Sequence, residues 1–116
     1  MIDFMSFDCN KPVYLQIVDN ILMRILNREL KSNDKMISVR EYGIKLGVNP
    51  NTIMRSYEYL TNQGIIYNKR GIGYFISDNA FDIVFNIHKK HFIEEEILNI
   101  KQKMKLFNLD YSIFNE

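Results

Sequence analysis

One short stretch of the sequence, NPNTIMR at residues 49–55, concentrates amide, hydroxyl and guanidinium groups. At helical spacing, Asn51, Thr52 and Arg55, with the neighbouring Ser56, lie away from the apolar positions of the same segment. Asparagine bonds adenine in a bidentate manner, and threonine bonds a base edge or contacts a thymine methyl group. A helix with this front end is therefore suited to a polar, negatively charged surface such as DNA.

The same stretch carries the signals of a helix start. Asn49 can cap the first turn, and Pro50 suits the first helical position because its missing N–H is not needed there. Apolar residues follow at helical spacing, at Ile53, Tyr57 and Leu60. Gly64 is then expected to end the helix. A pure capping role for residues 49–52 is the alternative to DNA contact.

A second, shorter helix is expected directly upstream. Ser38 and Glu41 have the Ser-x-x-Glu spacing of a capping box, which opens a helix through about Leu46. Gly47 ends it, and only a few residues pass before the Asn49 cap. Two short helices joined by a tight turn that contains glycine predict a helix-turn-helix.

The elements around this pair complete the expected arrangement. Pro12 can open a first helix with a wide apolar stripe, ending at about residues 27–29, and residues 31–35 are expected to form a loop. After Gly64, residues 65–67 and 74–76 are rich in β-formers, with Lys69, Arg70, Gly71 and Gly73 between them. A hairpin in this place predicts the winged variant of the helix-turn-helix.

The C-terminal part has a different pattern. Apolar residues alternate four and three positions apart, which is typical of a helical seam that needs a partner: Ile93, Ile97, Ile100, Met104 and Phe107. The upstream apolar residues at 81–87 are out of register with this seam, so we expect a shift or a break near His88 to Phe92. Packing of the seam against the first helix of the same chain is the alternative to dimerisation.

Charge and composition narrow the class of protein. Hydrophobic residues make up 47% of the 116 residues, which is too apolar for a disordered chain. The segment 35–75 carries six basic residues and only Glu41 and Glu58 as acidic ones, whereas 80–116 carries five basic and six acidic residues. Local positive charge in the middle of the chain fits a nucleic-acid contact.

The expected compartment is a reducing cytoplasm, since the single Cys9 cannot form an internal disulfide. No apolar run approaches the roughly 20 residues of a membrane span, and the acidic start does not resemble a signal peptide. We therefore expect no membrane association.

The assembled segments resemble the winged helix-turn-helix of the GntR family, and most closely its YtrA subfamily. The resemblance runs through KPVYLQIVDNI, SVREYGIKLGVNPNTIMRSYEYLTNQGII and RGIGYFI, and the tail HFIEEEILNIKQKMKLFNLD is similar to that subfamily's C-terminal dimerisation helices. The resemblance implies a homodimeric bacterial transcription factor, usually a repressor, that binds a palindromic operator. It leaves no room for a large effector-binding domain.

Five positions depart from the pattern of the family. Arg28 and Ser32-Asn33 stand where the family usually has Gly and Pro-Gly, and Ile37 replaces a customary Pro. Gly43 replaces a usual Ala inside the second helix, at a cost of roughly 0.5–1 kcal/mol. We therefore expect Gly43 to loosen this helix.

The predicted DNA-binding residues come from both helices and the hairpin: Ser38, Arg40, Asn49, Asn51, Thr52, Arg55, Lys69, Arg70 and Gly71. Arg40 stands where the family commonly presents an arginine to DNA. The alternative for Arg40 and Arg55 is a solvated cation paired with Glu41 or Glu58. An ordinary hairpin turn is the alternative explanation for the wing glycines, above all Gly73.

Other kinds of site find little support. His88, His91 and Glu95 fall at a spacing that can place metal ligands on one helical face, but a solvated polar face is the favoured interpretation. Gly71 and Gly73 lack the third glycine of a dinucleotide fingerprint. No nucleophile has a recognisable base, so we expect neither an enzyme nor a cofactor, and no residue pattern identifies a small-molecule effector.

The sequence thus predicts a mainly α protein with a small β-hairpin. We expect an N-terminal lead-in at 1–10, a winged helix-turn-helix at 11–78 and a C-terminal helical dimerisation region at 79–116. The predicted function is that of a sequence-specific transcriptional regulator. The alternative is a winged-helix protein-interaction module without DNA binding.

Overall fold

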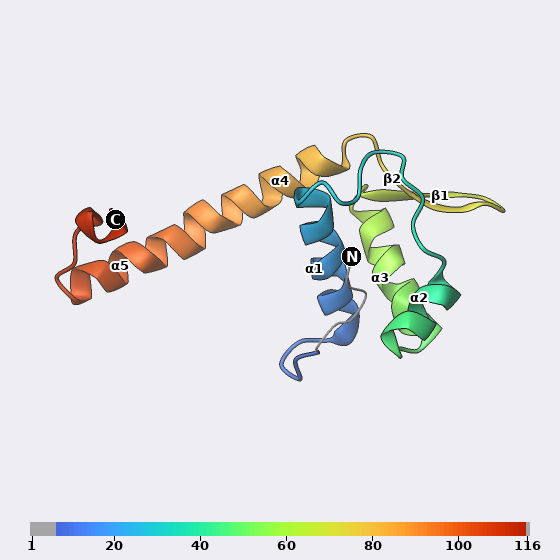
Figure 1. Cartoon of the computed structure of the whole chain (residues 1–116), viewed down its shortest axis with the longest axis horizontal. Helices are drawn as coiled ribbons and strands as arrows, with labels where there is room; N and C mark the ends of the chain where they lie inside the picture. The colour runs from blue at the N-terminus through green and yellow to red at the C-terminus, as the bar shows by residue number, and fades with distance from the viewer. Residues whose placement is uncertain (1–6, 116) are drawn as a thin grey trace. The chain divides into compact units, whose positions relative to one another are not determined.

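The computed structural model describes residues 7–115. The chain divides into two compact units, a first unit through Val84 and a second unit from Phe85 onward (Figure 1). The structure confirms the predicted fold class, since its helices are accompanied by a single two-stranded hairpin in the described residues. The assignment of functional domains at residues 10 and 78 stays a prediction.

The first unit contains the expected helices and hairpin in the expected order. Its elements are α1 (Val13–Leu26), α2 (Val39–Leu46), α3 (Pro50–Asn62), β1 (Ile66–Lys69) and β2 (Gly73–Ile76), followed by the start of α4 (Ala80–His91). The two strands are antiparallel and pair from Ile66 with Ile76 to Lys69 with Gly73. Lys35 forms an additional bridge to Phe75, so the loop after α1 lies along the outer edge of β2.

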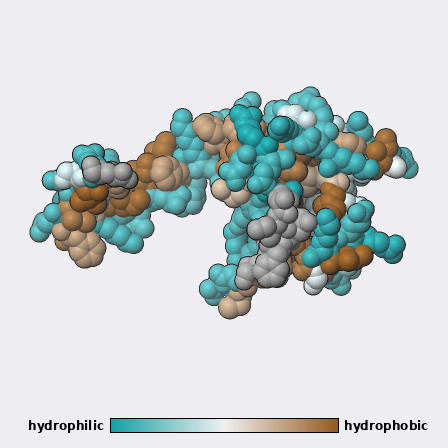
Figure 2. All heavy atoms as spheres, in the orientation of Figure 1, coloured by the Kyte–Doolittle hydropathy of each residue, from teal (hydrophilic) through white to brown (hydrophobic). Residues whose placement is uncertain are grey.

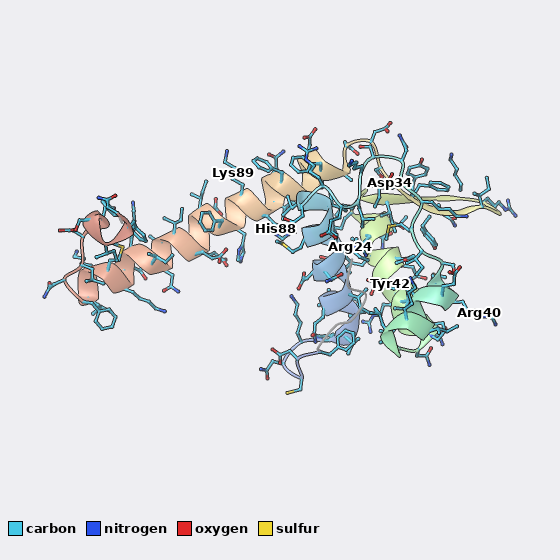
Figure 3. All side chains as sticks on the ribbon, in the orientation of Figure 1. Arg24, Asp34, Arg40, Tyr42, His88 and Lys89 are labelled. Carbon is cyan, nitrogen blue, oxygen red and sulfur yellow. The ribbon has the colours of Figure 1, made fainter. Side chains whose placement is uncertain are left out.

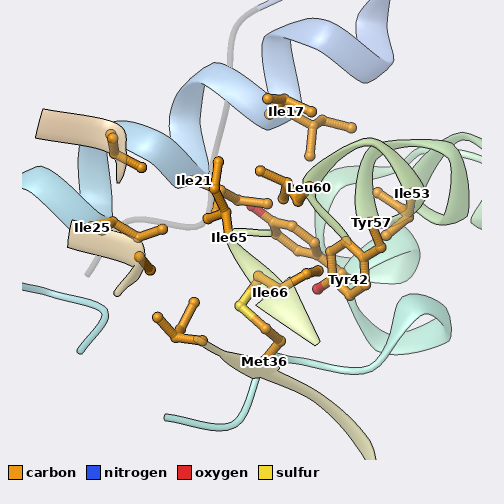
Figure 4. Close-up of a cluster of buried hydrophobic side chains, with 14 residues drawn as sticks. Ile17, Ile21, Ile25, Met36, Tyr42, Ile53, Tyr57, Leu60, Ile65 and Ile66 are labelled. Carbon is orange, nitrogen blue, oxygen red and sulfur yellow. The ribbon is translucent and has the colours of Figure 1, made fainter. Parts of the chain in front are cut away.

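The core of the first unit is closed by every one of these elements (Figure 4). Ile17, Ile21 and Ile25 of α1 meet Ile53, Tyr57 and Leu60 of α3, as the helical spacing predicts. The Tyr57 hydroxyl donates to the carbonyl of Ile37 at 2.6 Å. Burial, followed by the neighbouring Tyr42, raises the pKa of Tyr57, so its phenol stays neutral and keeps this bond.

The loop between α1 and α2 shows why two unusual residues are tolerated. Arg28 and Asn33 adopt φ values of 65° and 67°, the left-handed region that favours glycine, at positions where the family usually has glycine. The Arg28 guanidinium lies 3.5 Å from the centre of the Phe81 ring. Asn33 donates to the Asp78 carboxylate at 2.7 Å and accepts from the Tyr67 hydroxyl at 3.0 Å. These side-chain contacts offset the cost of the backbone conformation.

Gly43 has a packing role that the expected loss of helix propensity did not include. It is buried, and its carbonyl accepts a hydrogen bond from the Val48 N–H at 2.9 Å. A Cβ at this position would lie 2.8 Å from the Val48 carbonyl oxygen. The absence of a side chain therefore lets the turn between α2 and α3 close against α2, which is a tertiary effect that helix propensity does not register.

The second unit is helical, and the expected shift in register is present within it. α4 is followed without a break by a π-helical segment, η1 (Phe92–Ile97), and by α5 (Leu98–Leu106), and a short 3-10 helix, η2 (Tyr111–Phe114), follows. The structure thus places the shift at the end of the predicted range and just beyond it. A π-helical turn takes in an extra residue, so it re-aligns two apolar faces that are out of register.

Hydrophobic side chains of the second unit are mostly exposed, as Figure 2 shows for the face in view. Ile93, Ile100 and Phe107 are exposed, Phe107 by 70%, and Ile97 is half-buried. Met104 differs from the other residues of this seam, because it is only 7% exposed within the single chain. The Leu109 N–H donates to the Met104 carbonyl at 2.8 Å, so the segment after α5 turns back beside Met104.

Within residues 7–115, the helices are too short or too polar to cross a membrane.

Candidate nucleic-acid interface

The turn between α2 and α3 is built by the caps that the sequence predicts. The Glu41 N–H donates to the Ser38 hydroxyl at 3.2 Å, and Gly47 ends α2 in the left-handed conformation. The Asn51 N–H donates to the side-chain oxygen of Asn49 at 2.8 Å, and Pro50 is the first residue of α3. Only three residues separate the two helices, so α2 and α3 form a helix-turn-helix.

The first turn of α3 is open to solvent. Asn51 is exposed and Thr52 is half-buried, and neither side chain forms a hydrogen bond with a described residue. Asn49 is exposed as well, and its capping bond uses only its oxygen, which leaves the amide N–H₂ available. The structure therefore presents amide and hydroxyl groups at the helix terminus where a partial positive charge favours an anion.

Four cations of the predicted site also lack a partner for their charge. Arg40, Arg55, Lys69 and Arg70 are exposed, and none forms an ion pair or a hydrogen bond with any residue in 7–115. Figure 3 shows Arg40 pointing away from α3. The alternative pairing of the arginines with Glu41 or Glu58 is not formed. Glu41 instead accepts from the Ser38 hydroxyl at 3.2 Å.

Two of these cations lie over aromatic rings. The Arg55 guanidinium is 4.0 Å from the centre of the Tyr14 ring, which belongs to α1. Lys69 Nζ is 4.7 Å from the centre of the Phe75 ring on the neighbouring strand. Such contacts restrict the side chain but leave its N–H donors free for another partner.

The tip of the hairpin, which we call the wing, is a tight turn. The Ile72 N–H donates to the Lys69 carbonyl at 2.9 Å, and Gly71 has a φ of 80°, which side chains rarely adopt. Gly73 has a φ of 139° and lies against the Lys35 side chain. The turn conformation therefore accounts for both glycines, and a DNA contact by Gly71 stays a prediction.

Sequence reasoning missed the residues that connect the wing to α3. The Tyr74 hydroxyl donates to the Met54 sulfur at 3.6 Å, and the Tyr74 ring packs edge-on against Tyr57 at 5.1 Å. Tyr14 was missed as well. A contact between two elements that are distant in the sequence, such as α1 and α3, leaves no local signal. The one available hint for Met54 was its position one turn after Pro50 on the helix surface.

The candidate metal ligands of the second unit are engaged differently. His91 Nε2 lies 2.7 Å from a Glu95 carboxylate oxygen, and His91 Nδ1 lies 3.7 Å from Glu96. In the part of the chain that the structure describes, no three His, Cys, Asp or Glu side chains cluster as metal ligands would. His91 and Glu95 are exposed and polar, and His88 is half-buried.

Comparison with known proteins decides the family. Residues 13–76, which comprise α1–α3 and the hairpin, match the model of the bacterial regulatory proteins of the gntR family. The chain belongs to the GntR family. GntR proteins are transcriptional regulators rather than enzymes, so the polar helix terminus and its cations belong to a DNA-binding domain.

Relatives of similar length support this assignment. The chain is 42% identical to the uncharacterized HTH-type transcriptional regulator YhcF of Bacillus subtilis, over 87% of this chain and 83% of YhcF. It is 34% identical to the HTH-type transcriptional repressor YtrA of B. subtilis, over 85% of this chain and 70% of YtrA. The resemblance to the YtrA subfamily is thereby confirmed.

A solved GntR structure extends the likeness to the fold. A GntR family transcriptional regulator from Listeria monocytogenes superposes with a TM-score of 0.77 and is 34% identical, and the match covers 93% of each chain. Because this coverage reaches beyond the helix-turn-helix, the second unit also has a counterpart among GntR regulators.

Proposed function

We propose that this GntR regulator is a cytoplasmic repressor that binds a palindromic operator as a homodimer. The observation that carries the proposal is that four exposed cations of the helix-turn-helix and the wing, Arg40, Arg55, Lys69 and Arg70, have no carboxylate partner in residues 7–115. Four exposed cations without carboxylate partners, in a unit that also exposes the N-terminus of α3, favour a polyanionic ligand. The single cysteine, Cys9, is free and exposed, in keeping with a reducing compartment.

In this proposal α3 is the recognition helix. Asn51 and Thr52 bond base edges in the major groove, because the N-terminal residues of the second helix meet the bases in this motif. Arg40 contacts DNA from the start of α2, together with Ser38 at the cap of that helix, and Asn49 donates to a phosphate. Lys69, Arg70 and Gly71 of the wing approach the backbone or the minor groove.

Homodimerisation follows from the second unit. Large exposed apolar patches are rare on monomers, and a two-fold pairing of identical helices is the simplest way to cover one. Ile93, Ile97, Ile100 and Phe107 are the proposed contacts, whereas Met104 supports the seam from inside its own chain. Two-fold symmetry then requires two half-sites, about 10 bp apart or a multiple of that distance.

Repression is proposed by occupancy of the operator. The relative YtrA is named a transcriptional repressor, and this chain is 34% identical to it. A bound dimer in successive major grooves obstructs polymerase or another factor. This mechanism needs no cofactor, because occupancy of the operator is sufficient for repression.

Selection of bound sequences from a random DNA pool with the purified protein tests the proposal. We expect an enriched palindrome and a protein of dimeric mass in light scattering at micromolar concentration. The control protein carries Asn51→Ala and Thr52→Ala, and it should enrich no common sequence. Failure of the wild-type protein to retard genomic DNA fragments at moderate salt would favour a protein-interaction module instead.

A further inference from the structure

The contact between Arg55 and Tyr14 joins two helices of the first unit. Arg55 lies one turn after Asn51 on the exposed side of α3, and its guanidinium is 4.0 Å from the centre of the Tyr14 ring in the first turn of α1. The buried Ser56, next to Arg55, donates its hydroxyl hydrogen to the Tyr14 carbonyl at 2.8 Å. The backbone of Tyr14 is thus anchored to the same helix that carries the arginine.

This geometry leaves the guanidinium edge available. Stacking uses the face of the guanidinium, whereas its five N–H donors lie in the plane. Arg55 forms no hydrogen bond and no ion pair with any residue in the described chain. A planar guanidinium that is held on an aromatic ring matches a phosphate group in a bidentate manner.

The location of the ring selects the kind of DNA contact. Tyr14 belongs to α1, which lies beside the recognition helix, and it therefore holds Arg55 toward that flank of α3. Groups at the flank of a recognition helix meet the sugar-phosphate backbone, while the groups at its front meet base edges. Arg55 is therefore better placed for a phosphate than for the base contact of Asn51.

We propose that Tyr14 is a positioning residue that holds the Arg55 guanidinium for contact with a DNA phosphate beside the recognition helix. The inference rests on the proposed DNA contact of Arg55. Its physical basis is that a restrained side chain loses less rotamer entropy on binding than a free one. Tyr14 itself needs no contact with DNA.

A double-mutant cycle in DNA binding tests this role. Arg55→Ala should weaken binding of operator and of a mixed-sequence duplex alike, by roughly tenfold, and reduce the slope of log affinity against log salt by about one. Tyr14→Leu should weaken both by roughly two- to fivefold, the range of an exposed cation–π contact. Tyr14→Phe keeps the ring and should bind as the wild type does.

The decisive comparison is Tyr14→Leu in the Arg55→Ala background, where it should have no further effect. Tyr59→Leu is the matched control, since it removes an exposed tyrosine ring of the same unit that has no cation contact among the described residues. An equal loss from Tyr14→Leu with and without Arg55, or an equal loss from Tyr14→Phe, would overturn the inference. A wild-type protein that binds neither duplex would contradict the proposed function instead, so the two failures are distinguishable.

Discussion

The two units of this protein use their apolar residues in opposite ways. In the first unit, the isoleucines of α1, the apolar face of α3 and the hairpin bury one another completely. In the second unit, Met104 is the buried hydrophobic residue among those described, and its neighbours along the helix are exposed. The first unit has a closed hydrophobic core of its own, whereas the second unit has apolar surface that a single chain does not cover. We infer that the second unit is completed by association.

The largest expected effect comes from changing the exposed apolar seam of the second unit. Ile97→Asp with Ile100→Asp should convert a dimer into monomers, because two buried carboxylates would have to be desolvated at the interface. Operator affinity should fall by 10²-fold or more, since two linked half-sites bind far more tightly than one. Light scattering at micromolar concentration gives the mass, and a gel shift gives the affinity.

Asn99→Asp with Gln102→Asp is the matched control for this pair. Both residues are exposed on α5, and the change adds the same charge away from the apolar seam. The control should remain dimeric. Equal dissociation of both variants would point to added charge as the cause and would remove the support for this seam.

The next effect compares one leucine from each unit. Leu60 is 0% exposed and Leu106 is 77% exposed. Leu60→Ala should reduce the free energy of unfolding by about 2–5 kcal/mol, because it opens a cavity in the core. Leu106→Ala, made in the monomeric Ile97→Asp/Ile100→Asp background, should change the free energy of unfolding by no more than about 0.5 kcal/mol. Denaturant titration measures both, and similar losses would mean that the second unit has a core of its own.

Within the first unit, we expect the helices to contact bases and the wing to contact phosphates. Arg40→Ala should cost about 1–3 kcal/mol of operator binding and relax the preference at one base position. Lys69→Ala with Arg70→Ala should instead weaken all sequences alike and reduce the salt slope by about one for each lost phosphate contact. Affinities for single-base operator variants over a range of salt separate the two patterns. A selective loss at one base pair in the wing variant would show that the wing reads sequence.

The smallest expected effect concerns the turn that positions α3. Gly43→Ala gains about 0.5–1 kcal/mol from helix propensity but forces Cβ against the Val48 carbonyl, at 2.8 Å in the present structure. The backbone cannot move aside cheaply, so we expect a net loss of about 1 kcal/mol. Thermal unfolding tests the sign, and a raised midpoint would show that the turn has room for a methyl group.

The parts of the fold that the sequence predicted are those with local causes. The capping box at Ser38 and the Asn49-Pro50 start act within one helical turn, and the structure contains both caps. The stripes of α1 and α3 follow from helical periodicity alone. For this reason the helix-turn-helix and its exposed polar face were visible in the sequence before any tertiary information.

The parts that the sequence did not predict depend on contacts between distant segments. Gly43 owes its role to the approach of the Val48 carbonyl, and Met104 is covered by a turn that follows α5. Arg28 and Asn33 adopt left-handed backbone angles because Phe81, Asp78 and Tyr67 hold their side chains. The stacking of Arg55 on Tyr14 likewise requires α1 and α3 to be packed together.

The most direct test of the account is the mass of the complex between the protein and its selected operator. Analytical ultracentrifugation of the purified complex, with the Ile97→Asp/Ile100→Asp variant beside it, measures how many chains occupy one duplex. We expect two chains on each palindrome for the wild type and no stable complex at the same concentration for the variant. A stable complex of one wild-type chain per duplex, with full operator affinity, would contradict it.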